Sequence, residues 1–106
     1  MMGASDLRNL MKEAQRLQAE VAENQKKLAA AEVEATAGGG VVKAVVTGHG
    51  DLLRVEISPE VARPEDVDLL ADLIVAAVRE AQAKAKELAH QTMAPLARLL
   101  PPGFGP

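Results

Sequence analysis

The sequence predicts an α+β protein in which a long helix, a three-stranded antiparallel β-meander and a second long helix follow one another. Apolar residues recur every three to four positions up to about residue 31, the period changes to two from residue 32, and a nearly uninterrupted apolar segment begins at residue 69. A chain of 106 residues has room for a single domain, residues 1–106, with one modest core.

The first segment, up to residue 31, has the pattern of an amphipathic helix that Ser5 or Asp6 is suited to cap. Apolar positions form two seams with a period of seven, a pattern typical of helix-to-helix packing. The seams comprise Leu7, Ala14, Val21 and Leu28, and then Leu10, Leu17, Asn24 and Ala31. We interpret Asn24, the polar member, as a residue that sets the register or lies partly exposed.

Basic side chains project from the opposite side of this helix. They are Arg8, Lys12, Arg16, Lys26 and Lys27. The first three are spaced by four residues and form a line about 12 Å long. We expect Glu13 and Glu20 to lie nearer the seam and to leave mainly Glu23 among the bases. A solvated surface has the same pattern, so charge alone does not establish phosphate binding.

Three short segments with a period of two follow, separated by glycine-rich turns. We expect strands at residues 32–37, 41–47 and 53–58, with Leu53, Val55 and Ile57 on the apolar side of the third. The triplet at residues 38–40 lacks the spacing of a phosphate-binding loop. His49 has no second ligand at metal-binding spacing beyond Asp51, so we expect neither a metal nor a cofactor.

The second long helix is predicted to have Pro64 in its first turn and to end near Met93, because Pro95 disfavours its continuation. Basic side chains follow its apolar segment, and three of them extend the set of candidate binding cations to eight: Arg79, Lys84 and Lys86. We expect residues 1–5 and about 95–106 to be flexible ends.

The segment Leu69–Val78 is apolar nearly all round, so it requires cover on every side. A small sheet covers only one side, and a second copy of the chain is the simplest cover for the rest. We therefore predict that this segment forms both the core and the interface of a homodimer. The candidate interface residues are Leu69, Leu70, Leu73, Ile74, Ala77, Val78 and Ala81.

Composition excludes several classes of function. The chain has no cysteine and one aromatic residue, Phe104, which argues against disulfides, thiol catalysis and base stacking. Neither His49 nor His90 belongs to a recognisable catalytic arrangement, so we expect no enzyme and no small-molecule substrate. We find no membrane-spanning segment or signal peptide and expect a cytoplasmic protein. The net charge of −3 is uneven, because both ends are mildly basic and the middle is acidic.

Several fragments together resemble the bacterial YbaB/EbfC nucleoid-associated proteins. They are AGGG at residues 37–40, VK at 42–43, Gly48 and Gly50, Ile57 with Pro59, DLIVAAV at 72–78 and LPPGF at 100–104. The resemblance spans essentially the whole chain. It implies a tweezer-like homodimer that binds double-stranded DNA in the nucleoid, organises it and in some members regulates genes.

The residues and the resemblance together favour DNA binding in which the eight candidate cations contact phosphates, with little sequence specificity, since no cluster of side chains is committed to base edges. The alternative is a helical scaffold or prefoldin-like holdase that grips unfolded chains through apolar helix ends. Leu7, Leu10 and Met11 at one end, and Met93, Leu96 and Leu99 near the other, are available for that role.

Overall fold

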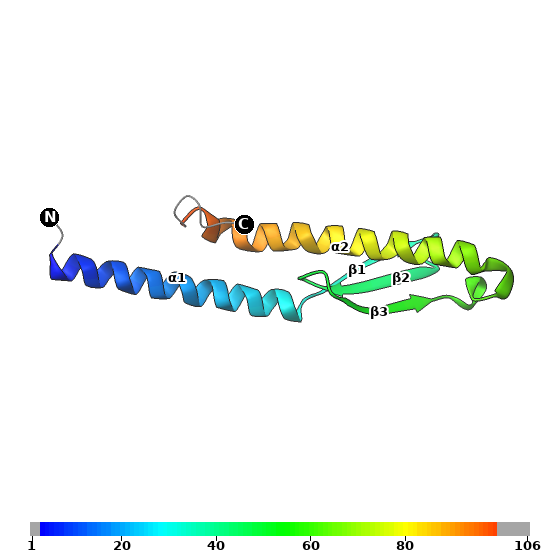
Figure 1. Cartoon of the computed structure of the whole chain (residues 1–106), viewed down its shortest axis with the longest axis horizontal. Coiled ribbons are helices and arrows are strands. Elements are labelled where there is room, and N and C mark those ends of the chain that lie inside the picture. Colours follow the sequence, from blue (N-terminus) through cyan, green and yellow to red (C-terminus); the bar gives the residue numbers. More distant parts are fainter. Residues whose placement is uncertain (1–2, 100–106) are drawn as a thin grey trace.

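A computed structural model describes residues 3–99 of the chain. The molecule is elongated, with extents of 75 × 22 × 16 Å, and consists of two long helices and a small sheet at one end (Figure 1). The predicted order of elements is confirmed. The elements are α1 (Ala4–Ala30), β1 (Glu32–Ala37), β2 (Val42–Thr47), β3 (Leu52–Ile57), the 3-10 turns η1 (Pro59–Val61) and η2 (Pro64–Asp66), and α2 (Val67–Ala97).

The three strands form an antiparallel sheet in the order β1-β2-β3, with β2 in the centre. Its register pairs Ala35 with Ala44 and Ala44 with Val55, so these side chains share one face. A bulge between Val45 and Val46 shifts β3, and Leu52 pairs with Val46. The prediction that Leu53 continues the apolar alternation of the third strand is therefore wrong, because a bulge inserts an extra residue and changes which side chains share a face.

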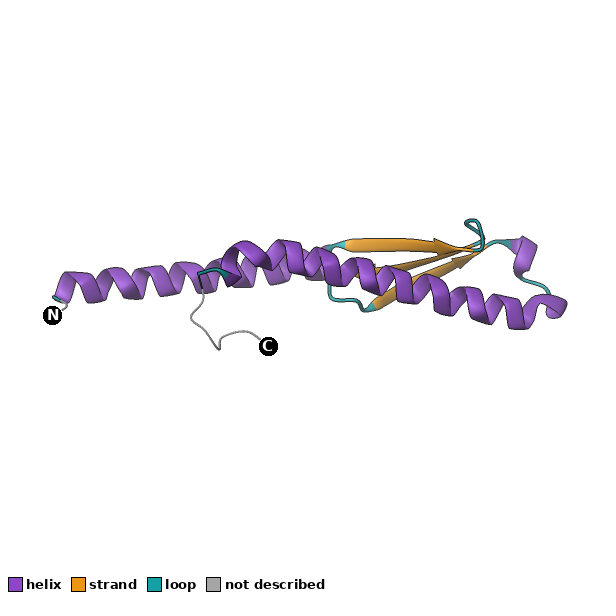
Figure 2. Ribbon diagram, turned by 90° about the horizontal axis from the view of Figure 1, so that it is seen from above, coloured by secondary structure: helices purple, strands orange, loops and turns teal. Residues whose placement is uncertain are grey.

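The core lies between α2 and one face of the sheet (Figure 2). Ala77, Ala81 and Ala85 are 0% exposed and pack against the buried Val42 and Val46 of the central strand. Alanine at these positions lets the helix approach the strands closely and costs no side-chain entropy. The helix contacts β1 and β2, so one element fixes the relative position of two strands and the returning helix.

The end of α1 is attached to the rest of the molecule at two places. The side-chain amide of Asn24 donates a hydrogen bond to the Thr92 carbonyl of α2 at 3.4 Å, in accord with the register-setting interpretation. The Gly48 amide donates to the Leu28 carbonyl at 2.8 Å. A Cβ at Gly48 would lie 2.5 Å from that oxygen, so only glycine permits this approach. These contacts hold α1 along α2 near the sheet.

Residues 4–16 of α1 are exposed throughout and extend beyond the end of α2 (Figure 1). We call this segment the arm, and the sheet with α2 the body. The predicted cap at Ser5 or Asp6 is wrong, because the helix begins at Ala4 after the N-cap Gly3. The Asp6 carboxylate instead accepts a hydrogen bond from the Gly3 amide at 3.3 Å. The ordered helix thus includes part of the predicted flexible end.

Two predictions about proline positions are also wrong. Pro64 lies in the 3-10 turn η2, which leads directly into α2 at Val67. The second helix continues through Pro95 to Ala97 rather than ending near Met93. Proline has a helical φ angle and costs one backbone hydrogen bond, and we attribute the continuation to Leu96, which is buried beside it. Residues 100–104, which carry the LPPGF fragment, lie outside the described residues.

Candidate nucleic-acid interface

The cations of the arm differ in how fully they are neutralised. Arg8 and Lys12 are exposed and belong to none of the ion pairs among residues 3–99. Arg16 lies 2.7 Å from the Glu13 carboxylate and 2.9 Å from that of Glu20. The expectation that these two glutamates stay near the seam, away from the bases, is wrong, because long side chains at i+3 and i+4 reach one another on a helix.

The paired charges around Arg16 also shift ionisation. The Arg16 guanidinium donates a hydrogen bond to Glu13 and attracts it electrostatically, and both effects lower the pKa of the Glu13 carboxyl. The same two effects of Glu13, together with the charge of Glu20, raise the pKa of Arg16. Arg16 therefore has its charge compensated by its own helix, which leaves Arg8 and Lys12 as the arm's free cations.

The other candidate cations lie in the last turns of α1, next to the sheet, and along α2. Lys26 and Lys27 are exposed in the last turns of α1 and belong to none of the ion pairs of residues 3–99. Arg79 and Lys86, seven residues apart, share an exposed side of α2. Lys84 lies on another side, and its ammonium donates a hydrogen bond to the Glu34 carbonyl of β1 at 3.4 Å. The eight candidates thus fall into separate groups rather than one continuous line.

The face of the sheet that α2 does not cover carries a lattice of charges. Arg54 contacts Glu32 at 3.0 Å and Glu56 at 3.4 Å. Lys43 contacts Glu34 at 3.7 Å and Glu56 at 3.9 Å. Three carboxylates surround two cations, so this face is negative and repels phosphate. Sequence reasoning did not identify this lattice, although the alternation of charged residues along the strands was a signal for it.

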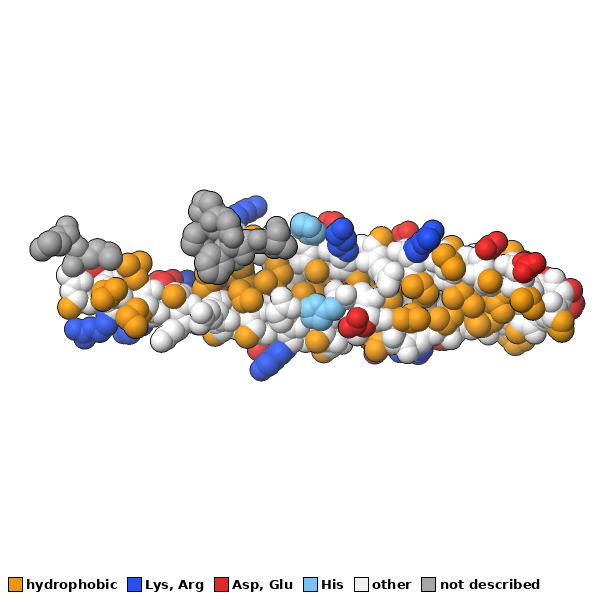
Figure 3. Space-filling view, viewed as in Figure 1, with side chains coloured by type: hydrophobic (Ala, Val, Ile, Leu, Met, Phe, Trp, Pro, Cys, Tyr) orange, Lys and Arg blue, Asp and Glu red, His pale blue; other side chains and the backbone are white. Residues whose placement is uncertain are grey.

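An apolar band crosses the other side of the body, between α2 and β3 (Figure 3). We assign to this band Leu52 and Ile57 of β3 and Val75 of α2, which are 50%, 40% and 47% exposed. The register places Leu52 and Ile57 on the same sheet face as the core. The band exists because α2 lies over β1 and β2 and leaves β3 largely uncovered. Sequence reasoning missed the contribution of β3.

The predicted interface residues divide into three groups in the structure. Ala77 and Ala81 are wholly buried against the sheet of their own chain. Four are half-buried at the edge of the core: Leu70, Leu73, Ile74 and Val78. Leu69 is half exposed. Within Leu69–Val78, the wholly buried residue is Ala77, and Leu70, Leu73, Ile74 and Val78 pack at the edge of the core. The apolar band lies beside this segment and remains exposed in the single chain.

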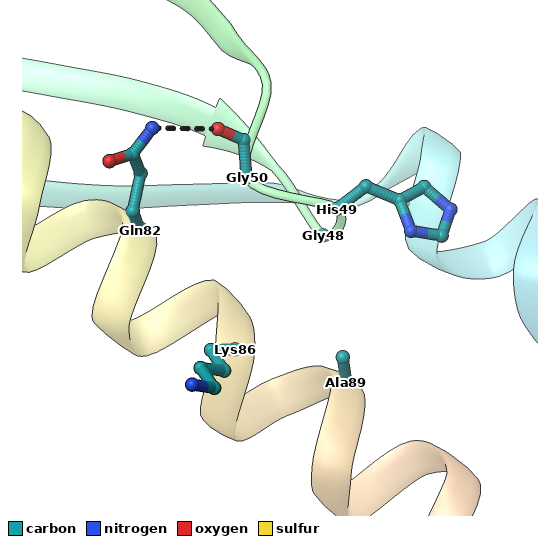
Figure 4. A pocket seen from close by; sticks show the side chains of 6 residues that line it. All are labelled: Gly48, His49, Gly50, Gln82, Lys86 and Ala89. Atoms are coloured by element: carbon teal, nitrogen blue, oxygen red, sulfur yellow. Dashed lines mark hydrogen bonds between the residues drawn. The ribbon is translucent and has the colours of Figure 1, made fainter. Parts of the chain in front are cut away.

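A shallow pocket of about 380 Å³ lies where the turn between β2 and β3 faces α2 (Figure 4). It is lined by Gly48, His49, Gly50, Gln82, Lys86 and Ala89. The Gln82 amide donates a hydrogen bond to the Gly50 carbonyl at 3.1 Å and holds the turn against the helix. The His49 ring extends toward α1, with its Nε2 atom 3.3 Å from the Gln25 carbonyl oxygen.

The structure describes no group of three or more metal-ligating side chains within residues 3–99. No helix in that range has the length and apolar character needed to cross a membrane. The described residues expose both cations and carboxylates along the two helices, a charge lattice with one excess carboxylate on one face of the sheet, and apolar side chains beside β3.

The fold is shared with a solved structure. The crystal structure of an uncharacterized protein from Helicobacter pylori superimposes with a TM-score of 0.68, covering 94% of this chain and all of the other. The two sequences are 19% identical, so this likeness concerns the fold alone.

Sequence relatives are much closer. A nucleoid-associated protein of Saccharopolyspora erythraea is 44% identical over 97% of this chain and 89% of its own length. Another from Streptomyces avermitilis is 46% identical over 91% of this chain and 85% of its own length. The sequence model of the YbaB/EbfC DNA-binding family matches residues 2–100. The chain therefore belongs to the YbaB/EbfC family of nucleoid-associated, DNA-binding proteins.

Proposed function

We propose that this protein binds double-stranded DNA as a homodimer, with little sequence specificity, and contributes to the organisation of the nucleoid. The observation that carries the proposal is the arm, an exposed helix whose Arg8 and Lys12 have no carboxylate partner among residues 3–99. Cations on a projecting helix are free to neutralise phosphates. The names of the relatives, which call them nucleoid-associated, support this role and this location.

The apolar band supports the homodimer. Leu52 and Ile57, at the two ends of β3, and Val75 of α2 are exposed on a body that has no further element of its own to cover them among residues 3–99. Each of these side chains is already about half buried, so covering the rest contributes on the order of 1 kcal/mol, and a two-fold symmetric contact counts each residue twice. A dimer joined through the bodies leaves both arms exposed and doubles the number of cations that face one duplex.

The proposal implies weak sequence selectivity and strong salt dependence. Contacts to phosphate position a duplex but carry no sequence information. With about six cations on phosphate, the logarithm of affinity falls with the logarithm of salt concentration at a slope of roughly −5. The acidic lattice around Glu32, Glu34 and Glu56 keeps DNA away from the outer face of the sheet.

The test is the affinity of the full chain for a random-sequence duplex, followed by fluorescence anisotropy across a salt series. Arg8→Ala with Lys12→Ala should weaken binding on the order of tenfold or more and reduce the slope by about two for each arm engaged. Arg54→Ala with Arg63→Ala removes the same charge from cations that are already ion-paired, and it should change affinity much less. Equal losses in both variants would show that net charge, rather than the arm, determines binding.

One observation favours a second candidate, the scaffold or holdase. Leu7, Leu10 and Met11 near the end of the arm are 53%, 53% and 55% exposed. Apolar side chains at the tips of helical arms are suited to hold unfolded chains. Suppression of aggregation of a denatured client protein, combined with no retardation of duplex DNA, would replace the DNA-binding proposal with this one.

A further inference from the structure

A pocket lined by the exposed cation Lys86 lies between the β2–β3 turn and α2, at the junction where the end of α1 joins the body through the hydrogen bond from Gly48 to Leu28 (Figure 4). We propose that it seats one phosphate group of the duplex backbone, with the Lys86 ammonium as its ionic partner. This inference rests on the proposed DNA binding and assigns a second, body-side contact in addition to the arm.

The walls of the pocket leave room for a phosphate. Gly48, Gly50 and Ala89 contribute no side-chain atoms beyond Cβ, so the floor is formed largely by backbone. The conformation of the turn is fixed from both sides, because Gly48 hydrogen-bonds to Leu28 of α1 and Gln82 of α2 hydrogen-bonds to Gly50. A hollow with fixed walls requires little reordering when a ligand enters, which favours binding.

Lys86 gives the pocket a positive charge that no carboxylate among the described residues neutralises. Lys86 is exposed and belongs to none of the ion pairs among residues 3–99. Lys86 lines the pocket from α2, and in Figure 4 its ammonium extends along the helix, away from the β2–β3 turn, while the His49 ring extends toward α1. A lysine side chain has four rotatable bonds, so binding a phosphate in the hollow requires a change of rotamer at Lys86. Lys84, two residues earlier, is directed to β1 by its hydrogen bond to Glu34. Lys84 therefore faces β1 and does not line the pocket.

The position of the pocket gives the contact a distinct role. Lys26 and Lys27 are exposed on the adjoining last turns of α1, so cations from both helices approach this junction. Phosphate contacts fix the register and orientation of a protein on a duplex. A phosphate held at the junction fixes the duplex relative to the body, whereas the cations of the arm contribute mainly attraction.

The first test compares single substitutions in the salt series. Lys86→Ala should weaken duplex binding on the order of tenfold and reduce the salt slope by about one per pocket engaged. Lys43→Ala removes a lysine that is already ion-paired with Glu34 and Glu56 on the face of the sheet that α2 does not cover, and it should change both much less. His49→Lys adds a fixed charge at the rim of the pocket and should strengthen binding several-fold. Ala89→Leu fills the pocket without changing charge and should weaken binding several-fold, with an unchanged circular dichroism spectrum.

The outcomes separate the two proposals. If the unaltered chain does not bind duplex DNA, the proposed function fails. If it binds with the expected salt slope but Lys86→Ala and Lys43→Ala have equal effects, or Ala89→Leu has none, the pocket inference fails and the proposed function stands.

A second measurement identifies the source of the phosphate. The amide resonances of Gly48, His49 and Gly50 should shift when a short duplex is added to the full chain. Inorganic phosphate, added at constant ionic strength, should not shift them at comparable concentration of phosphate groups. A shift with inorganic phosphate alone, or with neither ligand, would overturn the assignment of this pocket to the DNA backbone.

Discussion

The two long helices have similar lengths, 27 residues in α1 and 31 in α2, but opposite relations to the rest of the molecule. One side of α2 packs on the sheet through Ala77, Ala81 and Ala85, which are wholly buried. The first half of α1 is exposed on every side. An isolated helix as short as the arm is marginally stable in water. The helical conformation of the arm therefore depends on its own side-chain pairs and on contacts with a bound ligand, whereas α2 is stabilised by tertiary packing.

The largest expected effect is loss of the proposed dimer when the apolar band of β3 and α2 is charged. Ile57→Glu with Val75→Glu places charge in the apolar band and should convert a dimer into a single chain of 11.1 kDa, measured by light scattering. DNA affinity should fall more than tenfold, because a monomer presents one arm instead of two.

The matched control is Thr36→Glu with Ala83→Glu, which adds the same charges to exposed positions of a strand and of α2 outside the band. A dimer that survives in the first double variant, or dissociates equally in the control, would exclude the band as the interface. If the unaltered chain is a monomer that retards DNA, the homodimer proposal is wrong.

The next largest effect is a loss of stability when the side of α2 that packs on the sheet is altered. Ala81→Leu inserts a large side chain where Ala81 is 0% exposed, and overpacking of this kind should cost about 2–3 kcal/mol of unfolding free energy. Ala83→Leu on the exposed side of α2 should change it by no more than about 0.5 kcal/mol. Urea denaturation of both variants at one protein concentration measures the difference. Similar stabilities would contradict the close helix-to-sheet contact.

A smaller effect is expected where the two helices meet. Asn24→Asp replaces the amide that donates to the Thr92 carbonyl with a carboxylate that repels it, and should cost about 1 kcal/mol. Asn9→Asp makes the same change on the exposed arm and should be nearly neutral. Urea denaturation compares them, and lowering the pH until the introduced carboxylate gains a proton should restore part of the loss. An unaltered stability would mean that this hydrogen bond does not fix the register.

The smallest effect concerns the arm itself. Because Arg16 lowers the pKa of Glu13, this pair stabilises the arm fully above the ordinary pKa of a glutamate, and the contribution is lost as the pH falls through the lowered value. Circular dichroism should show a small loss of helix over that acidic range. Glu13→Gln should reduce that loss, and an identical pH profile for both proteins would exclude the pair as a support for the arm.

The local sequence pattern predicted the boundaries of the strands to within one residue. The period of two and the glycine turns predicted the first strand at residues 32–37, as observed, and placed the second and third strands within one residue at each end. These signals are local, because side-chain periodicity and glycine dihedral freedom are properties of short segments. The predicted end near Met93 was wrong, because the helix continues through Pro95 to Ala97; Leu96 beside the proline is 6% exposed, and no local pattern predicts that burial.

Only part of the candidate site could be predicted from the sequence. The basic residues of the helices were recognised, but the neutralisation of Arg16 depends on rotamers that reach Glu13 and Glu20. The pocket at Lys86 joins residues 48–50 to residues 82–89. Contacts between segments so far apart in the chain have no periodic signal.

By itself the sequence determined the order of helices and strands, the family and the apolar character of residues 69–78. The tertiary structure alone decided which surfaces remain free. An apolar helix can rest on either half of a sheet with the same local pattern, and only its packing over β1 and β2 leaves Leu52 and Ile57 uncovered. The reason is physical: periodicity defines the faces of one element, whereas the partner of each face depends on how distant elements pack together.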